Sequence, residues 1–198
     1  MPGRRLYGIQ CPPATVRPCL VQTHATGGPS AAAAGEYNCE GRRDLTVALH
    51  THKPLSVVII ALGTNDLKSR FNLSPQEIVG GIRVLVRDVQ RATGVSGHGD
   101  GTTLSLKVPK ILVVPPPLVS STDKSQVWGF AEGVGARAAE IARLLAAGGA
   151  GTESDGVSVL DPAAVPLPSP LDGVHFDAAA HSQLAAALAG RLSRLLRH

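Results

Sequence analysis

Two groups of polar residues in this sequence have the types and spacing to act on a carbonyl carbon. Asp172 and His175 stand three residues apart in the segment DGVH at 172–175. Within a turn, that spacing lets the carboxylate reach the imidazole and fix its tautomer, which a histidine needs to act as a general base. The second group centres on Asn65, in LGTND at 62–66, whose uncharged amide can donate a hydrogen bond to a reacting oxygen.

Each of these residues also has a purely structural interpretation. A lone histidine is more often a partly buried structural residue, an Asp before Gly commonly forms a turn, and an Asn often caps a turn or helix. We expect Asp66 to be structural rather than catalytic. A metal site at Asp172, His175 and His181 is not expected, because no carboxylate cluster accompanies these residues.

The residues from Val57 to Leu62 form an apolar run without alternation, which predicts a strand buried on both faces. A similar run at Ile111–Val114 and the short segment VSVL at Val157–Leu160 predict two more strands, parallel to the first and beside it. Ligands of such sheets bind just beyond the carboxyl ends of the strands, and we expect Asn65, Pro115 and His175 to lie at that edge. Strands that alternate with helices predict a three-layer α/β/α fold with a mainly parallel sheet.

Helix signals separate these strands. Ser74 is a candidate N-cap, with proline at the next position and Glu77 three residues on, and Gly94 is a candidate stop. A second helix is predicted at about 126–147, and a third begins near Asp177, with leucines recurring on one side.

The first 44 residues differ from the rest. Prolines and an alanine patch interrupt residues 1–35, so we expect an irregular segment at 1–44, followed by one domain at 45–198. A short strand at Cys19–Thr23 and a short helix around 45–49 are the elements suggested near this boundary. If the segment supplies no docked strand, the sheet should have an unpaired edge there.

Composition narrows the range of functions. With 43% hydrophobic and 17% charged residues among 198, the chain is globular. The net charge of +4 comes from scattered arginines, so no nucleic-acid partner is expected.

Three cysteines without a C-x-x-C pair favour reduced thiols in a cytoplasmic protein, although an organellar destination stays open. No run is long enough for a membrane helix, and neither a metal nor a cofactor is expected.

Together these segments resemble the SGNH (GDSL-type) hydrolases over about residues 45 to 196. LGTND at 62–66 is similar to that family's third block, and DGVHFD at 172–177 is similar to its fifth. The context agrees in order: KPL at 53–55, Lys68, the prolines at 115–116, and an aromatic pair that we place in the helix after them, Trp128 and Phe130.

The resemblance implies a flavodoxin-like fold and an esterase that acts on small acyl esters through an acyl-serine intermediate. It makes His175 the general base, Asp172 its orienting acid and Asn65 a donor of the oxyanion hole. For the second donor Gly27 or Gly28 is the candidate, although the surroundings of both depart from the family's pattern.

One departure concerns the nucleophile. The family's serine lies in a G-D-S motif after its first strand, and this sequence contains no G-D-S. Ser30 is the weak candidate that remains, and it follows no recognisable first strand. We therefore expect a missing or altered first strand, in a truncated or mis-spliced product or in a member that has lost catalysis. The alternatives are a non-catalytic module that binds an acyl or ester ligand, and a basic protein with an acidic polymer partner. The sequence leaves the oligomeric state open.

Overall fold

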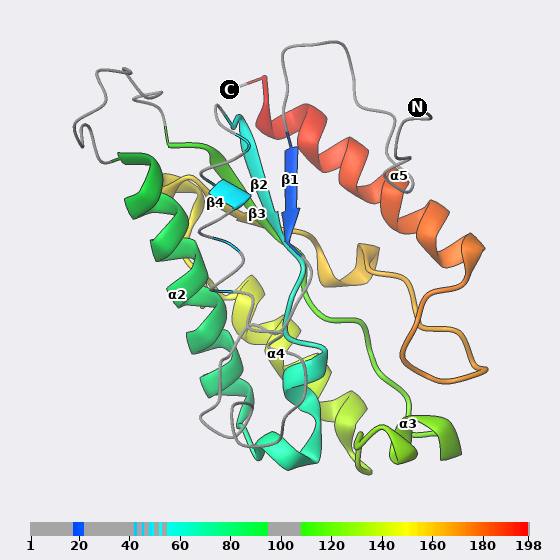
Figure 1. Ribbon diagram of the computed structural model, residues 1–198. Helices are drawn as coiled ribbons and strands as arrows, with labels where there is room; N and C mark the ends of the chain where they lie inside the picture. The colour runs from blue at the N-terminus through cyan, green and yellow to red at the C-terminus, as the bar shows by residue number, and fades with distance from the viewer. Residues whose placement is uncertain are drawn as a thin grey trace, which may run out of the picture.

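The computed structural model describes residues 18–21, 55–94 and 108–197, with the single positions 42, 45, 48, 49 and 52. Within these residues the chain forms three layers, with a parallel sheet between helices (Figure 1). The sheet contains β1 (Pro18–Val21), β2 (Val57–Ile60), β3 (Lys110–Val113) and β4 (Val157–Val159), in that spatial order. The predicted α/β fold and the parallel arrangement of the three later strands are confirmed.

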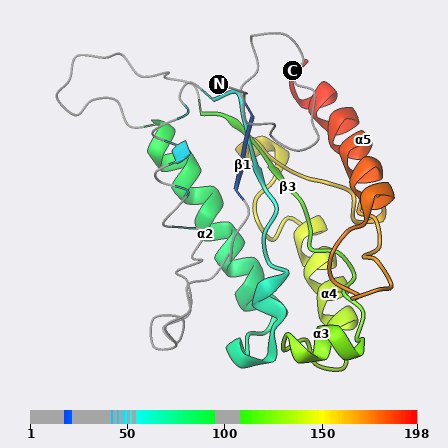
Figure 2. The ribbon, with the colours of Figure 1, turned by 45° about the vertical axis from the view of Figure 1, so that its right-hand side comes forward.

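The two faces of the sheet are covered by different helices. Successive strand residues point to opposite faces, so Val58 and Ile60 pack with α2 (Pro75–Gly94) and α4 (Val134–Ala146). Val57 and Ile59 pack on the other face, toward α5 (Ala178–Leu195). In the rotated view α5 stands on the opposite side of the sheet from α2 (Figure 2). Burial on both faces explains why these strands are apolar without alternation.

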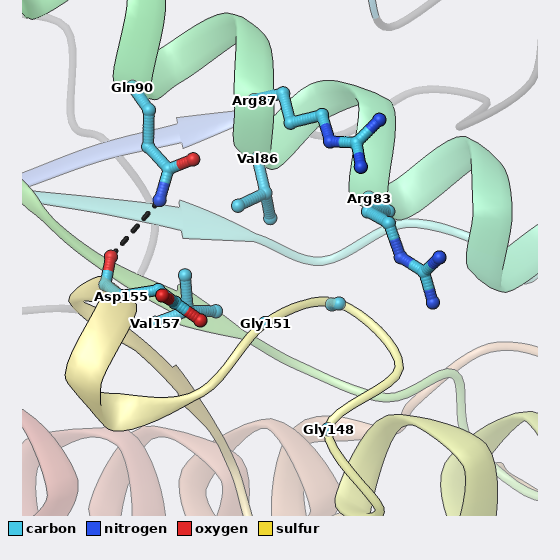
Figure 3. Close-up of a pocket in the computed structure, with 9 residues that line it drawn as sticks. Arg83, Val86, Arg87, Gln90, Gly148, Gly151, Asp155 and Val157 are labelled. Carbon is cyan, nitrogen blue, oxygen red and sulfur yellow. Dashed lines mark hydrogen bonds between the residues drawn. The ribbon is translucent and has the colours of Figure 1, made fainter.

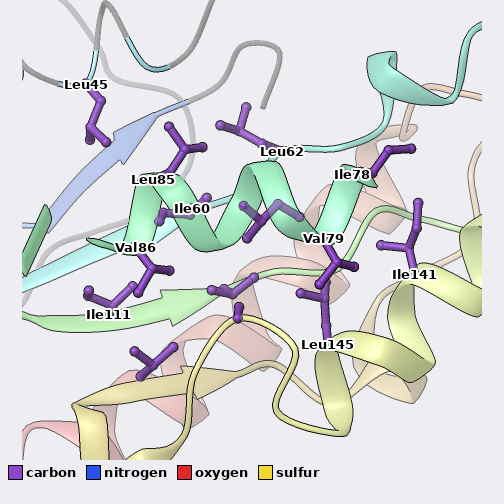
Figure 4. Packing of buried hydrophobic residues seen from close by; sticks show 14 of the residues in the cluster. Leu45, Ile60, Leu62, Ile78, Val79, Leu85, Val86, Ile111, Ile141 and Leu145 are labelled. Carbon is purple, nitrogen blue, oxygen red and sulfur yellow. The ribbon is translucent and has the colours of Figure 1, made fainter. Parts of the chain in front are cut away.

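The larger part of the core lies between α2, α4 and the sheet (Figure 4). Ile82 on α2 and Ile141 on α4 are fully buried, and so is Ile111 on β3. Burying each such side chain stabilises the fold by roughly 1.5–3 kcal/mol. Helix α2 is therefore held against the sheet mainly by its apolar stripe.

Local caps fix where the helices begin. Ser74 and Glu77 form a reciprocal cap at α2: the Ser74 amide donates to Glu77 Oε2 at 2.7 Å, and the Glu77 amide donates to Ser74 Oγ at 3.2 Å. Asp177 caps α5 by accepting a hydrogen bond from the Ala180 amide at 2.8 Å. Both predicted helix starts are confirmed.

The helix predicted at 126–147 is wrong as one element. The chain forms α3 (Asp123–Val127), a turn, and then α4, and the aromatic residues 128 and 130 lie in the turn rather than in a helix. Gly129 and Gly133 have φ angles of 89° and 77°, which no residue of a right-handed helix adopts. These two left-handed glycines separate the helices.

The sheet edge beside β2 is paired. Pro18 to Val21 align with Val57 to Ile60 in parallel register, so the expected unpaired edge is wrong. Proline stands at the first position of β1, where a missing N–H is tolerated. The predicted strand at Cys19–Thr23 is confirmed in part, and the rest of residues 1–35 lies outside the described residues. Described positions 45, 48 and 49 are helical, as predicted.

Candidate active site

The turn before α5 brings Asp172 and His175 into direct contact. Nδ1 of His175 lies 2.9 Å from Oδ2 of Asp172. The other carboxylate oxygen accepts hydrogen bonds from the backbone amides of His175 and Val174, both at 2.8 Å. These two amide hydrogen bonds, with the imidazole contact, lower the pKa of Asp172 from 3.8 to about 2. The carboxylate is therefore ionised at neutral pH and orients the imidazole.

Gly173 lets this turn approach the loop that follows β3. Its φ angle is 73°, and its carbonyl accepts a hydrogen bond from the Ser120 amide at 2.8 Å. A Cβ at this position would lie 2.4 Å from the Ser120 carbonyl oxygen. Only glycine fits here, for its backbone conformation and for its size.

The same loop supports Asp172 directly. Thr122, the N-cap of α3, donates its hydroxyl to the Asp172 carbonyl at 2.9 Å. Ser125 is fully buried and donates to the Ser120 carbonyl at 2.9 Å. The residues after β3 are thus tied to the Asp172 turn, although about fifty positions separate them in sequence.

One ring nitrogen of His175 stays available. Its side chain is 68% exposed, while that of Asp172 is 18% exposed. Trp128 meets the imidazole edge to face, with ring centroids 5.2 Å apart. Among the described residues, Nε2 has no hydrogen-bond partner. An imidazole held at Nδ1 with Nε2 free is the arrangement a general base requires.

Asn65 begins the short helix η1 (Asn65–Leu67) just beyond β2. It is half-buried, and its side-chain amide makes no hydrogen bond within the described part of the chain. Gly63 before it has a φ angle of 112°, which turns the chain out of the strand. Figure 1 shows this segment, α3 and the loop before α5 at the end of the sheet to which the strands point.

Two contacts hold the Asn65 segment in place. Arg137 on α4 donates to the Leu67 carbonyl at 3.0 Å and also to the Leu73 carbonyl. Ser69 donates its amide and hydroxyl to the Gly129 carbonyl at 2.8 and 2.9 Å. The segment carrying Asn65 is therefore joined to the turn carrying the tryptophan that contacts His175.

The remaining predicted site residues differ in placement. Gly27, Gly28 and Ser30 lie outside the described residues. Asp66 is buried, at 1% exposure, and lies beside Asn65 in η1. His181 contacts Phe176 edge to face rather than Asp172.

The described residues contain no group of three or more His, Cys, Asp or Glu side chains that could hold a metal. No helix in this part of the chain has the length and apolar character to cross a membrane.

Sequence reasoning missed the residues that support the site from a distance. The sequence does not indicate the supporting contacts of Arg137 and Thr122, because an arginine on a helix and a threonine before a helix are both common. Trp128 was noted only as context for a family resemblance. The one local signal available was Thr122 itself, since threonine three residues before serine indicates a helix N-cap.

Comparison with known proteins identifies the family through solved structures. Neither protein-family models nor curated proteins give a match. The M. smegmatis aryl esterase is 30% identical with a TM-score of 0.70, covering 87% of this chain and 74% of its own. Its inhibitor-bound form gives 32% identity and a TM-score of 0.69, with the same coverage. A carbohydrate acetylesterase from Sinorhizobium meliloti is 31% identical with a TM-score of 0.69, covering 82% of this chain and 71% of its own.

The chain belongs to the SGNH hydrolase family. In this family setting, the described residues provide a histidine–aspartate pair and an asparagine at the carboxyl end of one parallel sheet. The resemblance noted in the sequence is confirmed at the level of family and fold.

Proposed function

We propose that this SGNH hydrolase carries an esterase site for small acyl esters, with His175 as general base and Asp172 as its orienting acid. Asn65 donates a hydrogen bond to the oxyanion. The observation that carries the proposal is the His175–Asp172 pair, held at 2.9 Å with the second imidazole nitrogen free within the described chain. The aryl esterase and acetylesterase relatives support carboxylic esters as the substrate class.

The mechanism starts when Nε2 of His175 removes the proton of the attacking hydroxyl group, whose oxygen then bonds to the carbonyl carbon of the ester. The ionised Asp172 holds the neutral tautomer that has its proton on Nδ1, and it stabilises the imidazolium that forms. As the attacked carbonyl becomes tetrahedral, its oxygen gains negative charge, which the Asn65 amide stabilises. The imidazolium then returns the proton to the leaving alcohol, and a water that His175 activates in the same way hydrolyses the acyl intermediate, which releases the acid and restores the hydroxyl.

The lack of a convincing nucleophile limits the rate of this reaction. The 198-residue sequence has no G-D-S motif, and Ser30 is the weak candidate for the attacking hydroxyl. A serine hydroxyl is a poor nucleophile unless the base contacts it, so serines elsewhere on the surface cannot substitute. We therefore propose that this 198-residue chain supports little ester turnover even though its base and acid are well placed.

A second function uses the same geometry without turnover. The Asn65 amide, which has no hydrogen-bond partner among the described residues, can hold the carbonyl of an acyl ligand, and Trp128, which contacts His175 edge to face, offers it an apolar surface. In this alternative the chain is a binding module for esters or related acyl compounds. Retention of an amide analogue such as 4-nitroacetanilide without hydrolysis of the ester would favour it.

Hydrolysis of p-nitrophenyl acetate tests the proposal. We expect a rate barely above the uncatalysed one, and a change of less than about tenfold in His175→Ala, since a base with nothing to activate contributes little. His181→Ala is the matched control, because it removes another histidine nearby that does not contact Asp172.

Robust turnover would contradict the proposed impairment, and two variants would then identify the mechanism. Collapse of the rate in both His175→Ala and Ser30→Ala would make Ser30 the nucleophile. Collapse in His175→Ala alone would indicate a water activated directly by His175. Robust turnover that survives His175→Ala would refute the role of the pair.

A further inference from the structure

A cavity at the other end of the molecule has no part in the esterase site. It has a volume of about 400 Å³ and lies between the second half of α2 and the loop that leads from α4 to β4. Its wall contains Gln90 near the end of α2 and Val157, the first residue of β4. The cavity is therefore near the amino end of that strand, whereas the Asn65 segment and the loop before α5, which carries His175, lie at the end to which the strands point (Figure 1).

Two arginines one helical turn apart line this cavity. Arg83 and Arg87 are at positions i and i+4 of α2, where side chains are neighbours. Figure 3 shows both side chains extending from α2 beside the loop of Gly148 and Gly151. Like charges at this spacing repel, so an anion between them would relieve an unfavourable interaction.

The arginines retain most of their hydrogen-bonding capacity. Arg83 donates Nε to the Gly149 carbonyl at 2.7 Å, which fixes one edge of its guanidinium against the cavity wall. Its two terminal nitrogens have no acceptor within the described chain, and Arg87 has none at all there. Two guanidinium groups with free N–H donors match the oxygens of a phosphate group.

Nearby acidic groups do not neutralise this pair. Asp88, on the same helix, pairs with Arg42 at 2.7 Å. Asp155 lines the cavity, but its Oδ2 accepts from the Thr152 hydroxyl at 2.8 Å and the Thr152 amide at 3.0 Å. Its Oδ1, which has no partner among the described residues, offers an acceptor to a ligand hydroxyl, and two arginines with one aspartate leave the lining with a net charge of +1.

Glycines bring the loop backbone up to the cavity. Gly148 and Gly151 have φ angles of 86° and 130°. A Cβ on Gly149 would lie 2.6 Å from the Leu144 carbonyl oxygen, so the backbone there is in close contact with α4. Gln90 fixes the far side by donating to the Asp155 carbonyl at 3.0 Å. The wall opposite the arginines is therefore formed by a constrained loop.

We propose that Arg83 and Arg87 bind the phosphate group of a small molecule in this cavity. The group is either inorganic phosphate or a phosphomonoester with hydroxyls, which would face Asp155. Arg91 stands one further helical turn along α2 but does not line the cavity, so we assign the phosphate to Arg83 and Arg87.

Isothermal titration of the full chain with sodium phosphate and with glucose 6-phosphate, at constant ionic strength, tests this proposal. We expect a Kd of about 1 mM or tighter for one of them. Arg87→Gln should weaken binding about tenfold or more, because it removes a charged donor that has no structural partner within the described residues. Arg83→Gln should do the same if it stays folded by circular dichroism. The matched control is Arg194→Gln, which makes the same change of charge at an exposed position of α5.

Comparing the two ligands identifies what the site binds, and comparing the variants shows whether the two arginines bind it. Tighter binding of glucose 6-phosphate than of phosphate assigns the site to an ester, and equal binding assigns it to the phosphate group alone. No binding of either at several times that concentration overturns the proposal. Equal weakening in Arg87→Gln and Arg194→Gln also overturns it, since the effect would then come from net charge. Ester hydrolysis by His175 does not enter this readout.

Discussion

Gly173 offers a direct test of how the turn that carries Asp172 and His175 is held in place. We predict that Gly173→Ala destabilises the protein much more than Gly156→Ala, although both residues have nearly the same left-handed conformation. Their φ angles are 73° and 74°. They differ in surroundings: a Cβ at 173 would lie 2.4 Å from the Ser120 oxygen, whereas a Cβ at 156 meets nothing within 4 Å.

The expected loss of unfolding free energy in Gly173→Ala has two parts. Alanine in a left-handed conformation costs roughly 1–2 kcal/mol, and both variants bear that cost. At 173 the Ser120 carbonyl must also move, which disturbs the Ser120 and Thr122 hydrogen bonds to the turn. Each such bond contributes about 0.5–1.5 kcal/mol, so Gly173→Ala should cost about 2 kcal/mol more than Gly156→Ala.

Thermal and urea unfolding of the two variants measure this difference. For a domain of this size, about 2 kcal/mol corresponds to roughly 4–8 °C in Tm. NMR of the imidazole should show that the His175 environment changes in Gly173→Ala and stays unchanged in Gly156→Ala. Equal losses of stability in the two variants, within about 0.5 kcal/mol, would refute the close approach of the turn to Ser120.

Two further predictions concern the supports of the site. Arg137→Met removes the donors to the Leu67 and Leu73 carbonyls and should cost about 2–4 kcal/mol in urea unfolding, with faster amide exchange in residues 64–73. Arg143→Met, which breaks only an exposed pair on the same helix, should cost less than about 1 kcal/mol, and a similar cost for both would contradict the role of Arg137. Because the folded pKa of Asp172 is depressed to about 2, its stabilising contribution is complete above about pH 4 and is lost as the pH falls toward 2. The difference in unfolding free energy between the wild type and Asp172→Asn should therefore shrink over that range, and a constant difference would refute this pKa.

The sequence by itself determined the features that depend on neighbouring residues. Apolar runs identified β2 and β3, because a strand buried on both faces has no solvent side to make polar, and the shorter VSVL at 157–160, with one buried serine, identified β4. The cap residues Ser74 and Asp177 fixed two helix starts through hydrogen bonds within three residues. The Asp172–His175 pair belongs to the same class, since both partners lie in one turn.

One local pattern predicted a helix that the tertiary structure divides into two. The helical pattern across 126–147 suggested one helix, yet Gly129 and Gly133 adopt left-handed angles that interrupt it. Glycine is tolerated inside helices at a cost of about 1 kcal/mol, so its presence alone did not require a break. In the turn between α3 and α4, the Gly129 carbonyl accepts a hydrogen bond from the hydroxyl of Ser69, sixty residues away in the sequence.

Only the tertiary structure decided which distant segments meet. Arg137 reaches the Leu67 carbonyl across seventy residues, and Thr122 reaches Asp172 across fifty. The pairing of Pro18–Val21 with β2 and the placing of Arg83 and Arg87 opposite the loop before β4 are of the same kind. Such contacts depend on strand order and helix packing, which bring together residues whose local sequences carry no mark of one another. The sequence therefore determines the Asp172–His175 pair, while the fold determines which distant residues hold that pair in place.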